Sequence, residues 1–388
     1  MTAFRLAPAA LAESRSRAEA SIAAGRASAL LARADGGEAL RDEDLAALLL
    51  ARDVGTDDLL DLADRRPTGG PHLETFSPLY LTNECDAECA MCGMRRVNPK
   101  LARETANDPV VAQQLDLLYR RGLRGVALVT GEYHHGPRRD DMLAKVERAV
   151  VTALELGFEH VLINAGSLDA DEYRRLLSKL PVGRDEKTVP RLTMCTFQET
   201  YDPAVYRRFI GSNPANPRSD FVRRLENFDR AIDAGLRSVN PGVLLGLNRD
   251  TAFELLALIA HARHLLARSA QVYVSLPRLR KATGTAHHAG VSDDLLFRFA
   301  AIVSFGVPDA KVVISTREPP AVQRRLLPVI GVLTPGSPGV APYTEAGARF
   351  EIEASQFEVL DQRPIEAVLA DAIAAGIAIA GYEPGARS

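Results

Sequence analysis

Short apolar runs alternate with longer amphipathic stretches over most of this 388-residue chain. Runs rich in apolar and β-branched residues predict eight strands, at 75–82, 124–130, 158–164, 191–197, 237–245, 271–276, 311–316 and 328–333. Apolar residues at three- and four-residue spacing predict intervening helices, at 110–121, 139–156, 170–180, 219–235, 251–268 and 291–304. This alternation predicts an α/β fold, a parallel (β/α)8 TIM-type barrel. An open doubly wound sheet is the weaker alternative, because no Gly-rich dinucleotide turn follows the first strand.

Two appendages flank the predicted barrel. Residues 1–70 form an N-terminal helical extension that ends in the Pro- and Gly-rich linker 67–71. Residues 71–340 form the barrel. Residues 341–388 form a C-terminal segment that ends in an amphipathic helix and docks on the barrel.

Charge and composition favour a small-molecule enzyme. The chain has 47 basic and 50 acidic residues, so its net charge of -3 creates no field that would gather nucleic acid or an anionic membrane. Charged residues interrupt the apolar residues of the first segment every few positions, which suits neither a signal peptide nor a membrane span. We therefore expect a cytoplasmic protein with no nucleic-acid or membrane partner.

Three of the four cysteines lie within eight residues, directly after the first predicted strand. The thiolates of Cys85, Cys89 and Cys92 suit three irons of a [4Fe-4S] cluster and leave the fourth iron open. A zinc site is the alternative, with the nearby pair His134–His135 completing the ligands, and it would make the protein a zinc-stabilised binding module without turnover. Cys195 lies inside a predicted strand, so we expect a buried apolar side chain there.

The Cys-x-x-x-Cys-x-x-Cys spacing after a barrel strand resembles the radical S-adenosylmethionine (SAM) superfamily. The resemblance implies two cofactors, a [4Fe-4S] cluster and SAM, with the amino and carboxylate groups of SAM bound to the open iron. Thr130-Gly131-Glu132 resembles the motif that meets the SAM amino group. For Val243 and Leu244 a plain core role is the alternative to adenine contact. The resemblance assigns SAM contacts to residues near the cysteines and at the ends of later strands, namely Met91, Gly131, Glu132, Asn164, Gln198, Glu199, Val243 and Leu244.

The stretch 77–83 and the Gln-Glu-Thr-Tyr sequence at 198–201 resemble the aromatic amino acid lyases of this superfamily. The stretches LTMCTFQETYD, VNPGVLLGL and STREP are most similar to its tryptophan-lyase branch, in thiopeptide antibiotic biosynthesis, over about residues 70 to 360. This resemblance implies that Arg317 binds the substrate carboxylate. The guanidinium group suits this role because it is planar and permanently charged. It also implies that Tyr80 and Phe197 line the aromatic pocket and that Thr334, which replaces a serine, lies near the polar head.

Other readings of these residues remain open. Arg317 is alternatively a structural residue paired with Glu318 or another acid. Arginine pairs such as Arg223–Arg224 predict solvent-facing helix surfaces, although one of them is a candidate for the SAM carboxylate. Glu84 also replaces a tyrosine of the branch, which loosens the assignment of the substrate.

The resemblance implies a lyase that converts L-tryptophan to 3-methyl-2-indolic acid and consumes SAM. A 5'-deoxyadenosyl radical would take a hydrogen from the amino group, and a carboxyl-bearing fragment would then leave Cα and migrate to the indole ring. An electron donor such as flavodoxin or ferredoxin is expected. The alternative is a tyrosine lyase that cleaves Cα–Cβ to p-cresol and dehydroglycine. A hydrogenase-maturation role is disfavoured, because no second cysteine cluster appears near the C-terminus.

Overall fold

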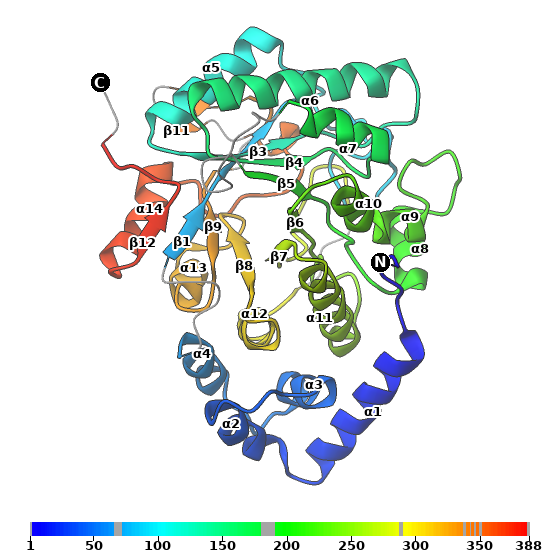
Figure 1. Ribbon diagram of the computed structural model, residues 1–388, viewed down its shortest axis with the longest axis vertical. Helices are drawn as coiled ribbons and strands as arrows, with labels where there is room; N and C mark the ends of the chain where they lie inside the picture. The colour runs from blue at the N-terminus through cyan, green and yellow to red at the C-terminus, as the bar shows by residue number, and fades with distance from the viewer. Residues whose placement is uncertain are drawn as a thin grey trace.

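The computed structural model describes residues 2–65, 72–179, 191–286, 290–336, 339–341, 343–344, 347–348 and 351–385. Ten parallel strands form one curled sheet in the order β12-β1-β9-β8-β7-β6-β5-β4-β3-β2, and helices surround it (Figure 1). The strands are β1 (His72–Thr75), β2 (Ser77–Tyr80), β3 (Gly125–Val129), β4 (His160–Asn164), β5 (Arg191–Cys195), β6 (Ser238–Asn240), β7 (Gln271–Ser275), β8 (Ala310–Ser315), β9 (Val332–Thr334) and β12 (Ala378–Ala380). The short strands β10 (Tyr343–Thr344) and β11 (Gly347–Ala348) form a separate antiparallel pair.

The first strand segment joins the two ends of the barrel. Only Phe76 separates β1 from β2, so the predicted strand 75–82 is a single path with a break in it. β1 pairs with the last barrel strand, β9, whereas β2 pairs with β3. The same stretch of chain therefore pairs with the next strand of the barrel on one side and with its last strand on the other. The predicted (β/α) barrel is confirmed.

Helices follow the barrel strands and cover the sheet from outside (Figure 1). Their bounds are α5 (Asp108–Arg120), α6 (Pro137–Leu156), α7 (Ala170–Leu177), α8 (Pro203–Ile210), α9 (Phe221–Leu225), α10 (Asn227–Asp233), α11 (Thr251–Ala267), α12 (Asp293–Gly306) and α13 (Pro320–Leu326). The single helix predicted at 219–235 is wrong, because the chain turns at Glu226 and forms α9 and α10. Among the described helices, none combines the length and the apolar character that crossing a membrane requires.

Four N-terminal helices pack on one side of the barrel, next to α11 and α12 (Figure 1). They are α1 (Pro8–Ala23), α2 (Ala27–Asp35), α3 (Asp42–Leu50) and α4 (Thr56–Asp64). The buried Arg298 of α12 donates to the carbonyls of Leu49 at 3.1 Å, Val54 at 2.7 Å and Ala51 at 2.8 Å. These include carbonyls that the end of α3 leaves without helical partners. The predicted boundary at residue 70 lies outside the described residues.

The C-terminal segment contributes a helix and a strand. The helix α14 (Ile365–Ala374) ends in a Schellman turn: Ile377 N donates to Ala372 O at 3.0 Å and Gly376, at φ 76°, donates to Ile373 O at 2.9 Å. The chain then continues as β12, which pairs with β1. The sequence predicted only a helix over this apolar run. That prediction was incomplete because Gly376 adopts the left-handed conformation that stops the helix.

The interior of the barrel is closed at its base. Glu74 accepts from Lys311 Nζ at 2.6 Å and from the Tyr273 hydroxyl at 2.7 Å. Burial disfavours its charge, but Arg191 and Lys311 outweigh that cost and lower the pKa of Glu74 to about 2. Above this charged layer lies an apolar layer made of Phe76, Ala127, Leu162, Tyr273, Val313 and Val332. A cavity that the described residues outline lies at the carboxyl ends of the strands.

Candidate active site

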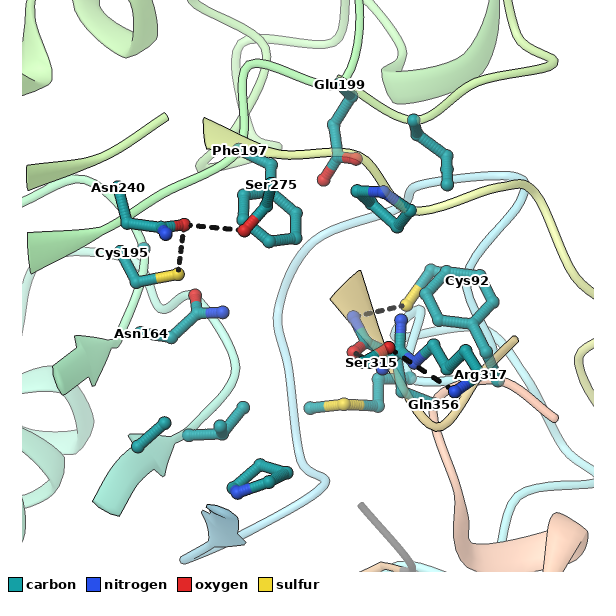
Figure 2. Close-up of a pocket in the computed structure, with 18 of the residues that line it drawn as sticks. Cys92, Asn164, Cys195, Phe197, Glu199, Asn240, Ser275, Ser315, Arg317 and Gln356 are labelled. Atoms are coloured by element: carbon teal, nitrogen blue, oxygen red, sulfur yellow. Dashed lines mark hydrogen bonds between the residues drawn. The ribbon is translucent and has the colours of Figure 1, made fainter. Parts of the chain in front are cut away.

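A cavity opens at the carboxyl ends of the barrel strands, where such barrels hold their active sites (Figure 2). Most of the residues predicted from the sequence line it. They are Tyr80, Cys85, Cys89, Cys92, Gly131, Glu132, Asn164, Phe197, Glu199, Leu244, Arg317 and Thr334. The structure thus brings together side chains from seven strand ends and from the cysteine loop.

Three predicted residues do not line the cavity. Met91 is buried in an apolar cluster with Met94 and Leu101, next to the cysteine loop. Val243 belongs to the main hydrophobic core, as its alternative reading had it. Gln198 is 2% exposed, and its Nε2 has no partner within the described part of the chain. Direct contact of these side chains with a ligand would need them to move.

A hydrogen-bond donor points at each sulfur of the cysteine triad. Glu132 N donates to Cys85 Sγ at 3.3 Å. Arg218 Nη1 donates to Cys89 Sγ at 3.3 Å, and Gln356 Nε2 donates to Cys92 Sγ at 3.5 Å. Such donors stabilise a thiolate, the form that binds iron.

Burial works against ionisation of the same thiols. It raises the pKa of Cys85, Cys89 and Cys92 to about 11. Burial thus favours the protonated thiols, and binding of a metal to the thiolates releases protons here.

The spacing of the sulfur atoms favours a cluster over a single zinc ion. Among the described residues, the only group of metal-binding atoms that all lie within 4.8 Å of one another is His135, Asp169 and Glu172, and the cysteine sulfurs do not form such a group. Zinc binds sulfur at about 2.3 Å, so two sulfurs on one ion lie at most about 4.6 Å apart. The triad is too widely spaced for one zinc ion, and His135 faces carboxylates instead of the cysteines. A cubane cluster binds each thiolate to a different iron and so does not require the three sulfurs to lie that close together.

Gly131 allows the turn after β3 to touch the cysteine loop. A Cβ atom at this position would lie 2.1 Å from Glu84 O and 2.7 Å from both Cα and Cβ of Cys85. No side chain fits into that space. The glycine predicted as part of a SAM motif is thus required by the packing of the cysteine loop as well.

Next to the turn at Gly131 lies a buried network of two acids and two arginines. Arg224 Nη1 lies 2.8 Å from Glu132 Oε2, and Arg218 Nη2 lies 2.9 Å from Glu199 Oε1. Arg218 Nε also lies 3.5 Å from Glu132 Oε2. Glu199 has φ 69°, a strained conformation for a residue with a side chain, and its ion pair fixes its carboxylate against the cavity. This network presents a charged wall next to the cysteines.

Sequence reasoning missed part of this wall. Arg224, predicted on a solvent-facing helix surface, is 5% exposed and lines the cavity. Its partner Glu132 lies on a different strand end, so no local pattern distinguishes it from Arg223. Arg218 lies in an irregular loop and Gln356 in the C-terminal segment, where periodicity offers no signal at all.

Arg317 lies across the cavity on the turn after β8 and has only neutral partners. Its Nη2 donates to the Tyr80 hydroxyl at 3.1 Å. It also donates to Gln356 Oε1 at 3.3 Å (Figure 2). The guanidinium also lies over the Phe357 ring, 4.8 Å from its centroid. No carboxylate in the described ranges lies within ion-pair distance of Arg317.

The alternative reading of Arg317 as a partner of Glu318 is wrong. Glu318 turns away and is bound by Arg278 and Arg280. Arg317 is half-buried, cationic and without an anionic partner among the described residues. It therefore offers a site for an anion that enters the cavity.

No protein-family model matches the chain. It is 28% identical over 359 residues to the 2-iminoacetate synthase of Escherichia coli strain K12, an alignment that covers 91% of this chain and 90% of that one. The 2-iminoacetate synthase of Salmonella typhimurium is 27% identical over 316 residues, 79% of this chain and 78% of that one.

Solved structures share the fold. The FeFe-hydrogenase maturase HydG of Carboxydothermus hydrogenoformans superposes with a TM-score of 0.81 at 24% identity, covering 97% of this chain and 86% of that one. Methylornithine synthase superposes with a TM-score of 0.69 at 18% identity, covering 90% and 97%. The chain is thus similar over most of its length to the 2-iminoacetate synthases, its barrel has the fold of these solved structures, and its cofactors are a [4Fe-4S] cluster and SAM.

Proposed function

We propose that this protein is a radical SAM lyase that cleaves the Cα–Cβ bond of L-tyrosine to give p-cresol and dehydroglycine. Dehydroglycine is 2-iminoacetate, the product in the name of the relatives that align over most of this chain. These relatives favour the tyrosine-cleaving alternative over the conversion of tryptophan that the sequence patterns suggested.

The observation on which the proposal rests is the placement of Arg317. It faces the cavity with no anionic partner among the described residues, and the cysteine triad lies against the same cavity. An amino acid whose carboxylate pairs with Arg317 would thus lie within the space that also contains the cluster ligands. Arg218, Arg224, Glu132 and Glu199 would hold the charged amino acid end of SAM, and Leu244 would contact its adenine.

The cluster with bound SAM supplies, after one-electron reduction, a 5'-deoxyadenosyl radical that removes one hydrogen atom. The task of the protein is then positioning. Arg317 holds the carboxylate, the hydroxyls of Tyr80 and Thr334 lie at the polar end, and Phe197 contributes an aromatic face to the ring.

The remaining chemistry balances with one further electron. Loss of a hydrogen atom from the amino nitrogen weakens Cα–Cβ, and homolysis of that bond leaves dehydroglycine and a 4-hydroxybenzyl radical. This radical becomes p-cresol by taking up one electron and one proton. A flavodoxin or ferredoxin would supply the electrons.

Product analysis tests the proposal. The anaerobically reconstituted protein is incubated with SAM and dithionite, and with L-tyrosine or L-tryptophan in separate reactions. Mass spectrometry should find p-cresol and 5'-deoxyadenosine from tyrosine. Formation of 3-methyl-2-indolic acid from tryptophan, with no p-cresol from tyrosine, would instead support the tryptophan lyase.

A further inference from the structure

Asn240, at the end of β6, presents an unused hydrogen-bond donor in the cavity wall. The side chain is 1% exposed and lines the cavity. Its Oδ1 accepts from Ser275 Oγ at 2.8 Å and from Cys195 Sγ at 3.4 Å, as Figure 2 shows. Its Nδ2 is buried and has no partner among the described residues.

Two neighbours hold this amide in one orientation. Ser275 and Cys195 come from the strands on either side of β6, and both donate to the same oxygen. Burial raises the pKa of Cys195 to about 12, so its thiol keeps the proton that it donates. With Oδ1 engaged twice, the amide directs Nδ2 as a donor. A buried donor of this kind requires a partner, and the cavity is where a ligand would supply it.

The rest of the surroundings suits an aromatic ring. Phe76, Ala127 and Val313 line the same cavity from the apolar layer of the barrel. Phe197 approaches closely because residue 242 is glycine: a Cβ there would lie 2.8 Å from Phe197 Cδ1. The wall around the unused donor thus combines apolar and aromatic side chains with the polar groups of Asn164 and Ser275.

We propose that Asn240 Nδ2 recognises the phenol oxygen of the substrate and so determines the specificity for tyrosine. This inference rests on the proposed function and names the residue that selects its substrate. In Figure 2, Asn240, Cys195 and Ser275 lie on the opposite side of the cavity from Arg317 and Gln356. A tyrosine whose carboxylate pairs with Arg317 therefore directs its side chain toward Asn240.

The donor discriminates among the three aromatic amino acids. A phenol oxygen accepts a hydrogen bond, whereas the indole N–H of tryptophan only donates and phenylalanine does neither. Tryptophan or phenylalanine in the same pose would leave Nδ2 unpaired. A site that hydrogen-bonds a substrate hydroxyl rejects analogues that lack it much more strongly than an apolar pocket does.

Equilibrium dialysis of labelled amino acids measures this selection without turnover. The cluster-loaded protein with SAM, kept anaerobic and without reductant, is compared with Asn240→Leu, which keeps the approximate shape and removes the donor. The dissociation constant for tyrosine should rise about tenfold to a hundredfold, and those for phenylalanine and tryptophan should change about threefold at most. Ser275→Ala, which removes one of the two groups that orient the amide, should weaken tyrosine binding by a smaller factor and keep the preference over phenylalanine.

Iron content and thermal unfolding establish that each variant is folded and loaded. If Asn240→Leu does not fold, the wild type still tests the inference, because phenylalanine bound as tightly as tyrosine would overturn it. An unchanged tyrosine-to-phenylalanine ratio in the variant would overturn it too, while p-cresol formation by the wild type would leave the proposed lyase intact. Absence of p-cresol with a retained Asn240-dependent preference would reject the lyase reaction and leave the recognition of the phenol supported.

Discussion

Replacing Arg317 by methionine should abolish the selection for a substrate carboxylate. Methionine keeps much of the length and the contact with Phe357 but loses the charge and the donors of the guanidinium. Since Arg317 forms no ion pair within the described structure, the free energy of unfolding should change little. The effect should therefore be on binding.

The magnitude follows from the partners of Arg317. Among the described residues, only Nη2 of the guanidinium is engaged, with Tyr80 at 3.1 Å and Gln356 at 3.3 Å, and the other N–H groups can form two parallel bonds to a carboxylate. Each charge-assisted bond contributes about 1.5–3 kcal/mol, and desolvation of the carboxylate reduces the sum to about 3 kcal/mol. Arg317→Met should therefore weaken tyrosine binding about a hundredfold. Arg317→Lys keeps the charge but loses the planar pair of N–H donors. Tyrosine binding by this variant should therefore weaken about tenfold.

Tyramine, which is tyrosine without the carboxylate, separates this effect from general damage to the pocket. The dissociation constants of tyrosine and tyramine are measured by equilibrium dialysis against wild type, Arg317→Met and the exposed control Arg207→Met. Wild type and control should prefer tyrosine, and Arg317→Met should bind both about equally. Equal weakening of tyrosine and tyramine binding by Arg317→Met would refute the carboxylate role.

Three further predictions concern the cluster and the fold. Alanine at any one of the three clustered cysteines should prevent incorporation of a complete cluster, measured as iron and sulfide per chain, whereas Cys195→Ala should keep it. Gly131→Ala should destabilise the protein by about 1–3 kcal/mol and lower its iron content, because the new Cβ meets Cys85 at 2.7 Å; Gly290→Ala, with open space around it, should change neither. Burial lowers the pKa of His160 and of His261 to about 3, so between pH 6.5 and 3 only the unfolded state binds these protons and stability falls as the pH falls. The free energy of unfolding in urea should drop by about 2.5 kcal/mol from pH 7 to 5.5, and by half as much in His261→Gln; an equal drop in that variant would exclude His261 as a source.

The barrel could be predicted because its strands are buried on both faces and so appear as continuous apolar runs. The predicted strands 124–130 and 271–276 contain β3 and β7 within one or two residues. The short helices α8 and α13, of eight and seven residues, were missed, although α7, also of eight residues, was predicted; a stretch this short carries only a weak helical period. β12 was missed because its pairing with β1 depends on contacts some 300 residues apart, which local propensity does not encode.

The site was predictable where topology fixes it. In a parallel barrel every strand end reaches the same face, so residues such as Tyr80, Asn164 and Arg317 had to converge once the strands were recognised. The partners that orient them come from loops or from distant helices, and their positions depend on tertiary packing. The sequence therefore showed which groups face the cavity but not which of their atoms are free. Only the structure shows that Arg317 has no anionic partner within the described chain. Only the structure shows, likewise, that Asn240 retains an unused donor.

The C-terminal segment, which the sequence pattern separates from the barrel, contributes Gln356 to the cavity of the barrel. Gln356 donates to Cys92 Sγ at 3.5 Å and accepts from the Tyr80 hydroxyl at 3.0 Å and from Arg317 at 3.3 Å. Its backbone carbonyl also accepts from Gly93 N at 3.2 Å, within the cysteine loop. One side chain from a segment predicted as an appendage thus contacts Cys92, Tyr80 and Arg317. Because Gln356 contacts all three, a shift of this segment would displace its contacts with Cys92 and with Arg317 together.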